Sequence, residues 1–239
     1  AHIEAGLRSG NIYSPWPEEM NRLLVSSLST YHFAPTEIAQ ENLLKMGISA
    51  DRIFVTGNTV VDALYTAMRK LRQDTLLQKE LGDLFNFELN KKIIMATVHR
   101  RENHGKPLEQ ICEAIKKLVQ LHNLQFYIPV HPNPRVKKII TLKLNKTRNV
   151  KLIEPLDYLQ TIYLMSNSFL VLTDSGGIQE EAPSLNKYTM VLRNTTERLE
   201  AIDAGLSTLI GTDKERIIQS VSKFIDSPIL PTAFSKNPY

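Results

Sequence analysis

Short apolar runs alternate with helix-type periods along almost the whole chain. The apolar runs predict buried strands at 31–35, 52–57, 91–99, 124–131, 150–155, 169–174 and 188–193. Between these runs, apolar residues recur every three or four positions and predict helices at 17–29, 36–47, 57–71, 107–121 and 213–225. This alternation is typical of an α/β protein with parallel sheets.

The strand signals fall into two unequal groups. The segment 71–90 is polar, charged and free of strand signals, so it predicts a connector. A first sheet with only two or three strands would leave faces of its buried parallel strands uncovered. We therefore expect 1–57 to be the back half of a Rossmann-like domain and 58–239 to be a second Rossmann-like domain. Because the chain starts without Met inside a motif-like run, the sequence also predicts that it is cut at both ends.

Composition and charge narrow the range of partners. The 239 residues carry a net charge of +4, with no dense basic tract recognised, which argues against a nucleic-acid-binding face and suits a small anionic ligand. The single cysteine, Cys112, rules out an intrachain disulfide and lies in a helical apolar pattern that predicts a buried thiol. With no apolar run of membrane-spanning length, we expect no membrane association and a cytoplasmic location.

The run FLVLTDSGGIQEEAP at 169–183 carries the strongest chemical signal. A buried strand leads into Asp174, Ser175, Gly176 and Gly177, and a helix is predicted from Ile178 onward. Two glycines at such a turn let backbone N–H groups approach a ligand, and the helix start offers free donors to a phosphate. The turn also lies where ligands bind in open α/β sheets. A plain tight turn with a serine cap is the alternative.

Two carboxylates, Glu180 and Glu181, follow one turn into this helix. An acidic residue in that position can reach the ribose hydroxyls of a nucleotide. The pattern is neither G-x-G-x-x-G nor a P-loop, so we expect neither NAD nor ATP, and no other cofactor.

Carboxylates also gather in HIEAGLRSGNIYSPWPEEMNR at 2–22. Glu4 follows a strand end, and Glu18 and Glu19 open a helix after Pro17. These groups could converge on one cleft for acid–base chemistry. Acids that merely complement the helix dipole are the alternative for Glu18 and Glu19.

Two histidines follow neighbouring strand signals. His99 is followed by Arg100 and Arg101, and His131 precedes a turn rich in Pro and Asn. Because parallel strands end at one sheet edge, we expect the two rings to lie side by side, with the arginines placed to grip phosphate. No H-x-H or H-E-x-x-H pattern completes a metal site, so none is expected.

These runs together resemble the non-hydrolysing UDP-N-acetylglucosamine 2-epimerases. The matching runs, in family order, are HIEAGLRSG, YSPWPEEMNR, FVTGNTVVDAL, HRREN, PVHPNP, LTDSGGIQEEAPSL and RNTTERLEA. The resemblance implies two Rossmann-like domains facing each other across a cleft, as in the two-domain nucleotide-sugar glycosyltransferases, with the first domain incomplete here. The family's GTRPE-type loop and HGDT-type segment are not in this sequence.

The resemblance also implies an activity, the reversible conversion of UDP-GlcNAc to UDP-ManNAc by elimination and re-addition of UDP through 2-acetamidoglucal. It further implies a homodimer and a role in cell-surface polysaccharide synthesis. Carried over by motif, the catalytic residues are Glu4, Glu18 and His99, the UDP-binding residues are His131, Ser175, Gly176, Gly177 and Glu181, and candidates for binding a second, activating UDP-GlcNAc are Arg22 and Arg100.

Two residues depart from the family pattern, since Tyr188 and Leu199 stand where prolines are usual. Both changes affect loop geometry without removing a charged site residue. Two alternatives stay open, a UDP-sugar glycosyltransferase on the same scaffold and a non-catalytic UDP-binding remnant. The carboxylates Glu4 and Glu18 favour the epimerase over the transferase, while a hydrolysing epimerase fits the SGG and PWPEE runs less well.

Overall fold

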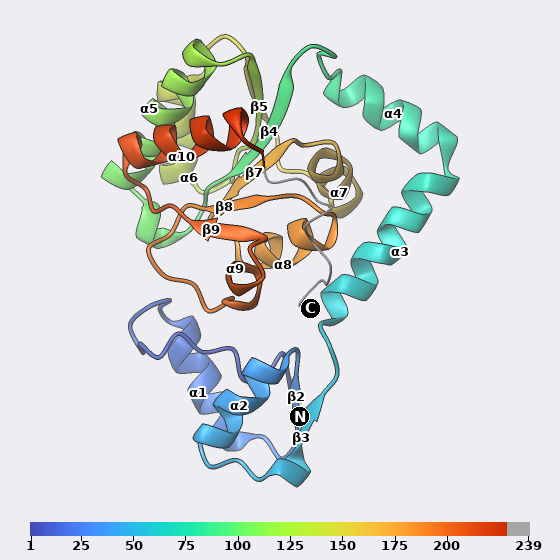
Figure 1. Cartoon of the computed structure of the whole chain (residues 1–239), viewed down its shortest axis with the longest axis vertical. Coiled ribbons are helices and arrows are strands. Elements are labelled where there is room, and N and C mark those ends of the chain that lie inside the picture. The colour runs from blue at the N-terminus through green and yellow to red at the C-terminus, as the bar shows by residue number, and fades with distance from the viewer. Residues whose placement is uncertain (229–239) are drawn as a thin grey trace.

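The apolar runs form two parallel β-sheets, one above the other along the long axis of the molecule (Figure 1). The structure is a computed structural model and describes residues 1–228. The first sheet has the order β1 (His2–Ile3), β2 (His32–Ala34), β3 (Ile53–Val55). The second has the order β6-β5-β4-β7-β8-β9, with bounds β4 Lys92–Thr97, β5 Leu124–Pro129, β6 Val150–Ile153, β7 Leu170–Thr173, β8 Thr189–Val191 and β9 Ser207–Leu209. All the strand pairs are parallel, which confirms the predicted fold class.

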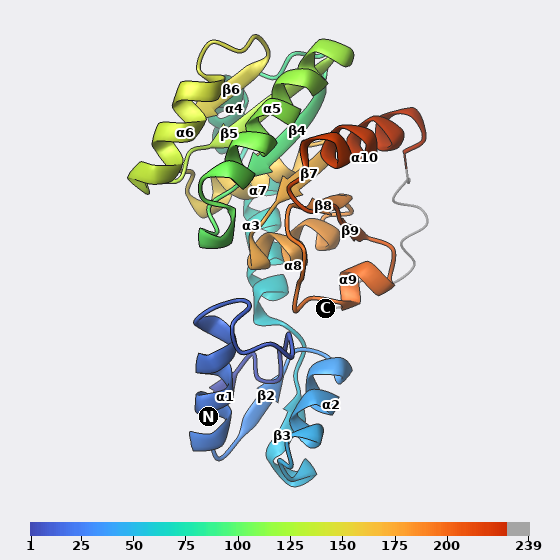
Figure 2. The same ribbon diagram turned by 90° about the vertical axis from the view of Figure 1, so that its left-hand side faces the viewer.

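Helices connect and cover these strands. Their bounds are α1 Glu18–Leu28, α2 Glu37–Lys45, α3 Thr59–Gln73, α4 Thr75–Phe85, α5 Lys106–Leu121, α6 Pro134–Leu144, α7 Tyr158–Ser166, α8 Gly176–Ser184, α9 Glu200–Asp203 and α10 Lys214–Asp226, with short 3-10 turns at η1 Ala50–Arg52 and η2 Arg101–Asn103. The first sheet with α1 and α2, here called the first block, lies below the second domain, and the chain passes between them as the segment that leads into α3 (Figure 2). The predicted boundary after residue 57 stays a prediction, and residues 229–239 of the predicted second domain lie outside the described residues.

The second sheet is buried on both faces, as its near-continuous apolar strands require. Ile94 and Ala96 of β4 face one core cluster, formed with α5, α6 and α10. Met95 between them faces the other, formed with α3, α4, α7 and α8. Cys112 on α5 is 1% exposed, and burial raises the pKa of its thiol to about 12. The prediction of a buried cysteine is therefore confirmed.

The connector predicted at 71–90 is wrong in one respect, because it contains the helix α4. Asp74 caps this helix by accepting a hydrogen bond from the Leu77 backbone N–H at 2.9 Å. Its apolar stripe, Leu77, Leu81 and Phe85, packs on the second domain. A stripe of one residue per turn amid charged neighbours is too narrow to outweigh the polar composition of the segment.

Candidate functional site

The candidate site lies where the chain of the second domain changes direction across its sheet. In the order β6-β5-β4-β7-β8-β9, the successive connections run outward on one side from β4 and on the other side from β7. Ligands of open α/β proteins bind in the crevice at the carboxyl ends of two such strands. His99 follows β4 and Asp174 follows β7, so both stand at this crevice.

Asp174 organises the crevice. Its side chain is fully buried and its carboxylate accepts hydrogen bonds from the backbone N–H groups of His99 at 3.0 Å and Arg100 at 2.9 Å, and from Asn103 Nδ2 at 2.9 Å. His99 Nδ1 lies 3.3 Å from the same carboxylate. The local sequence pattern puts Asp174 in the phosphate turn and predicts no role for it. Its acceptor function depends on residues more than 70 positions away, which local spacing does not show.

The start of α8 has the features of an anion site. The helix begins at Gly176, two residues earlier than predicted, because both glycines adopt helical backbone geometry. Ser175 is the N-cap residue, yet its hydroxyl makes no capping hydrogen bond, so it is available to a ligand. A Cβ on Gly177 would meet no heavy atom within 4 Å, so the space beside it is open. Free N–H groups, a free hydroxyl and open space together suit a phosphate.

The two predicted histidines do lie side by side. The rings of His99 and His131 stack with centroids 5.5 Å apart and an interplanar angle of 17°. Burial lowers the pKa of His99, and the nearby Asp174 carboxylate opposes that shift. Both rings line an apolar cavity of about 180 Å³, together with residues such as Pro155, Leu156 and Ile178.

Glu181 lies on the second turn of α8 and is buried. Burial raises the pKa of its carboxyl, and it shares a hydrogen bond with Tyr158, the first residue of α7. The neighbouring Glu180 points elsewhere, since its Oε1 accepts a hydrogen bond from Arg198 Nε at 2.7 Å. The two adjacent acids therefore have different surroundings, and the ribose-binding role of Glu181 stays a prediction.

The first block brings its carboxylates to the same edge. Glu18 at the start of α1 pairs with Arg100 Nη1 at 3.3 Å. Both residues line a cavity of about 690 Å³ with Trp16, His99 and neighbouring residues of the two loops. The adjacent Glu19 is 2% exposed and accepts from the Ser9 backbone N–H at 3.2 Å, so it has a structural role.

Glu4 faces the second domain from the end of β1. Its backbone is left-handed, with φ of 55°, and its carboxylate contributes to raising the pKa of Glu180, which burial chiefly lifts to about 7. Gly6 lets this loop lie directly on α2, because a Cβ there would be 2.1 Å from the Ala39 carbonyl oxygen. The described structure thus gathers Glu4, Glu18 and His99 along the boundary between the first block and the second domain. Their catalytic roles stay predictions.

Arg22 lies at the same boundary, where its Nη2 pairs with Glu197 Oε1 at 3.4 Å. Of the two departures from the family pattern, Tyr188 is buried, and its ring stacks on Phe224 with centroids 4.7 Å apart. Leu199 is 45% exposed. The aromatic side chain at 188 therefore fixes its strand end by packing in the core.

Within residues 1–228, no three His, Cys, Asp or Glu side chains are grouped so that they could hold a metal ion. None of the helices in this range is both long enough and apolar enough to span a membrane.

The two parallel-sheet units define the class: this is an α/β protein in which a first block faces a second domain that carries the crevice. The family model described as UDP-N-acetylglucosamine 2-epimerase matches residues 1–239. A crystal structure of UDP-GlcNAc 2-epimerase from Neisseria meningitidis bound to UDP-GlcNAc superposes with a TM-score of 0.96 and 49% identity, covering 100% of this chain and 65% of that one.

Two further relatives agree. The UDP-N-acetylglucosamine 2-epimerase of Salmonella typhimurium is 49% identical over 242 residues, covering 100% of this chain and 64% of the relative. The Methanocaldococcus jannaschii UDP-GlcNAc 2-epimerase, solved with UDP-GlcNAc and UDP, has a TM-score of 0.86 and 36% identity, covering 100% of this chain and 64% of that one. The chain belongs to the UDP-N-acetylglucosamine 2-epimerase family and spans about 64% of the length of the Salmonella relative.

Proposed function

We propose that this chain binds UDP-GlcNAc in the crevice and epimerises it reversibly to UDP-ManNAc. One observation carries the proposal. The start of α8 has a free Ser175 hydroxyl and open space beside Gly177, and it lies near the boundary that holds Glu4 and Glu18. A diphosphate at the helix start would place the attached sugar toward those carboxylates. The membership in an epimerase family and the UDP-GlcNAc bound by its Neisseria relative support this assignment.

The chemistry needs a base, an acid and a site for the leaving group. A carboxylate, Glu4 or Glu18, takes the C2 proton; the electron pair of the C2–H bond forms a C1=C2 double bond, and the C1–O bond breaks to release UDP. The charge that develops on UDP is stabilised by the N–H groups of α8 and by the Ser175 hydroxyl. UDP then adds back at C1 while a protonated group returns a proton to C2 from the other face. Asp174 holds both His99 and the backbone of Arg100, so His99 stands in the same crevice as a third catalytic candidate.

We propose the UDP contacts from the same geometry. Gly176, Gly177 and Ser175 take the diphosphate, Glu181 takes the ribose, and the uracil ring fits the apolar cavity beside His99 and His131. Arg100 lines the larger cavity and pairs with Glu18, and Arg22 pairs with Glu197 at the same boundary. These two arginines are our candidates for binding a second UDP-GlcNAc. We further propose that the protein acts in the cytoplasm as a homodimer and supplies cell-surface polysaccharide synthesis.

Proton NMR in D2O tests the proposed activity directly. When UDP-GlcNAc is incubated with the chain, we expect the C2 proton signal to disappear as the proton exchanges with solvent and UDP-ManNAc signals to appear. A persistent C2 signal, with saturation transfer still reaching the uridine protons, would favour the non-catalytic UDP-binding remnant. Transfer of the sugar to an acceptor, without epimerisation, would favour the glycosyltransferase.

Because the second domain is proposed to bind UDP and the first block to supply the acid–base carboxylates, we expect two substitutions to have different effects. We expect Glu181→Ala to weaken UDP binding by roughly 10- to 100-fold, because a hydrogen bond from ribose to a carboxylate is worth about 1.5–3 kcal/mol. We expect Glu18→Ala to leave UDP affinity nearly unchanged, because Glu18 faces Arg100 and the larger cavity. Isothermal titration with UDP measures both. Equal losses would contradict the assignment of the ribose to Glu181.

A further inference from the structure

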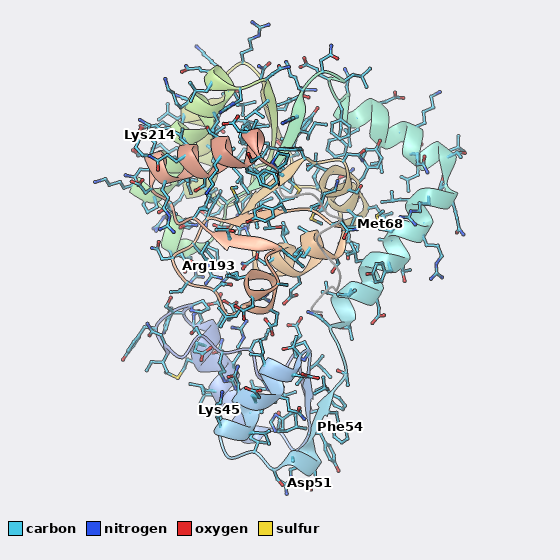
Figure 3. The ribbon with its side chains drawn as sticks, viewed as in Figure 1. Lys45, Asp51, Phe54, Met68, Arg193 and Lys214 are labelled. Carbon is cyan, nitrogen blue, oxygen red and sulfur yellow. The ribbon has the colours of Figure 1, made fainter. Side chains whose placement is uncertain are left out.

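A network of buried charges lies between the first block and the second domain, and Glu197 is its centre. The Glu197 side chain is fully buried. Its Oε1 accepts hydrogen bonds from Arg198 Nη1 at 2.5 Å and from Arg22 Nη2 at 3.4 Å, and its Oε2 accepts from Arg193 Nη1 at 3.2 Å. Figure 3 shows Arg193 on the side of the second domain that faces the first block. One carboxylate therefore holds three guanidinium groups.

Acceptors are the scarce component of this network. Arg22 Nη1 and Arg193 Nη2 are buried and have no hydrogen-bond partner among the described residues. Burial alone would raise the pKa of the Glu197 carboxyl, but Arg198, Arg193 and Arg22 together hold it at about 2. Glu197 therefore stays ionised at any working pH. Arg193 and Arg198 also pair with Glu102 and Glu180, whereas Arg22 pairs with no acid other than Glu197 among the described residues and depends on its charge.

The network connects the two sides of the proposed reaction site. Arg22 lies on α1, one turn after Glu18, so its position and that of Glu18 are fixed together. Arg198 lies against the start of α8, since a Cβ on Gly176 would be 2.7 Å from its Nη1. Within residues 1–228, two ion pairs join the first block to the second domain, Arg22–Glu197 and Arg100–Glu18. The acid of the first pair is fully buried, whereas the Glu18 side chain is 43% exposed. Arg22–Glu197 is therefore the pair that water screens less.

We propose that Glu197 is a positioning residue, whose carboxylate sets the place of α1 relative to the start of α8 by holding Arg22 and Arg198 in one array. It touches neither substrate nor reacting atoms in this role. The inference rests on the proposed function only for the catalytic meaning of α1 and α8. The placement of α1 by Glu197 can be measured without any ligand.

Hydrogen exchange of the unliganded chain tests the placement. In Glu197→Gln, which keeps the shape of the side chain and removes its charge, we expect the amides of α1 to exchange at least ~10-fold faster, because the helix loses its buried anchor. Exchange in β4 and α5 should stay unchanged. The matched control is Glu113→Gln on α5, where a half-exposed carboxylate pairs with Lys143 at 3.5 Å, and which should leave α1 unchanged. A second variant, Arg22→Met, removes only the partner on α1 and should accelerate α1 exchange in the same way.

The two variants combined decide whether Glu197 acts through Arg22. We expect the α1 exchange rate of Glu197→Gln/Arg22→Met to match that of the faster single variant, because both changes remove one contact. Unchanged α1 exchange in Arg22→Met, or uniform acceleration across β4 and α5 in Glu197→Gln, would overturn the positioning role in favour of general structural support.

The catalytic consequence has its own readout. In the NMR assay we expect Glu197→Gln to lower kcat by roughly 100-fold with a change in KM below about 3-fold, since ordering of the acid–base groups matters mainly in the transition state. A fall in kcat/KM that comes from KM alone would overturn the proposed positioning of the acid–base groups by Glu197. If the unsubstituted chain shows no C2 exchange, the proposed function fails while the hydrogen-exchange result still decides the role of Glu197.

Discussion

Replacing Asp174 by alanine should lower the free energy of unfolding by about 4 kcal/mol, because it leaves a set of buried donors without an acceptor. The backbone N–H groups of His99 and Arg100 and the Nδ2 group of Asn103 all donate to this fully buried carboxylate. The removal of three side-chain atoms leaves a gap too small to give each of these donors a water molecule. The loop that carries His99 should therefore lose its attachment to the end of β7.

Urea unfolding followed by circular dichroism and by the fluorescence of the single tryptophan, Trp16, measures this loss. The isosteric Asp174→Asn should lose about 2 kcal/mol, since one oxygen remains to accept. Asp51→Ala is the matched control, because Asp51 is exposed at the far end of the first block (Figure 3) and should change stability by less than about 0.5 kcal/mol. An Asp174→Ala variant as stable as the control would show that the carboxylate does not hold the loop.

The parts of the fold that the sequence predicted best are those with strong local signals. The strands β4, β5 and β7 are mostly apolar because both faces of the sheet are covered, so they stand out from their polar flanks. The helix α7 was missed because its residues are mostly apolar and give no polar face. Its capping box, Asp157 with Gln160, is the signal that could have revealed it. The strand β9 has only three residues and could not be distinguished from a loop.

The site also has residues that the local sequence predicted and residues that it did not. The phosphate turn at Ser175 to Gly177 and the two histidines follow from local pattern and from the rule that parallel strands end at one edge. The role of Asp174 and the pairing of Arg22 with Glu197 could not be predicted, because their partners lie 71 to 175 residues apart in the chain. Acidic and basic residues in loops usually remain hydrated, so only the packing of the two units shows that Arg193 and Glu197 are buried.

The substitution Gly176→Ala should weaken UDP binding by roughly 100-fold, through the Arg198 guanidinium that lies against this glycine. An added Cβ would be 2.7 Å from Arg198 Nη1, 2.8 Å from its Cζ and 3.0 Å from its Nη2. The guanidinium cannot move aside freely, because Nε donates to Glu180 at 2.7 Å and Nη1 donates to Glu197. Either the start of α8 shifts, and its N–H groups no longer converge on the diphosphate, or Arg198 gives up two charge-assisted hydrogen bonds.

These two responses give different results in the same samples. Isothermal titration with UDP reports the affinity, and urea unfolding reports the cost of overpacking, for which we expect about 2 kcal/mol. Gly82→Ala in α4 is the matched control, since its Cβ would make an ordinary contact at 3.6 Å from the Tyr163 hydroxyl, and the change should be neutral or slightly stabilising. If α8 shifts, the affinity for UDP falls with little loss of stability. If Arg198 moves instead, stability falls and the affinity for UDP changes little, because the N–H groups of α8 stay in place. An unchanged affinity without a loss of stability would mean that the diphosphate does not bind at the start of α8, and the proposed site would have to be abandoned.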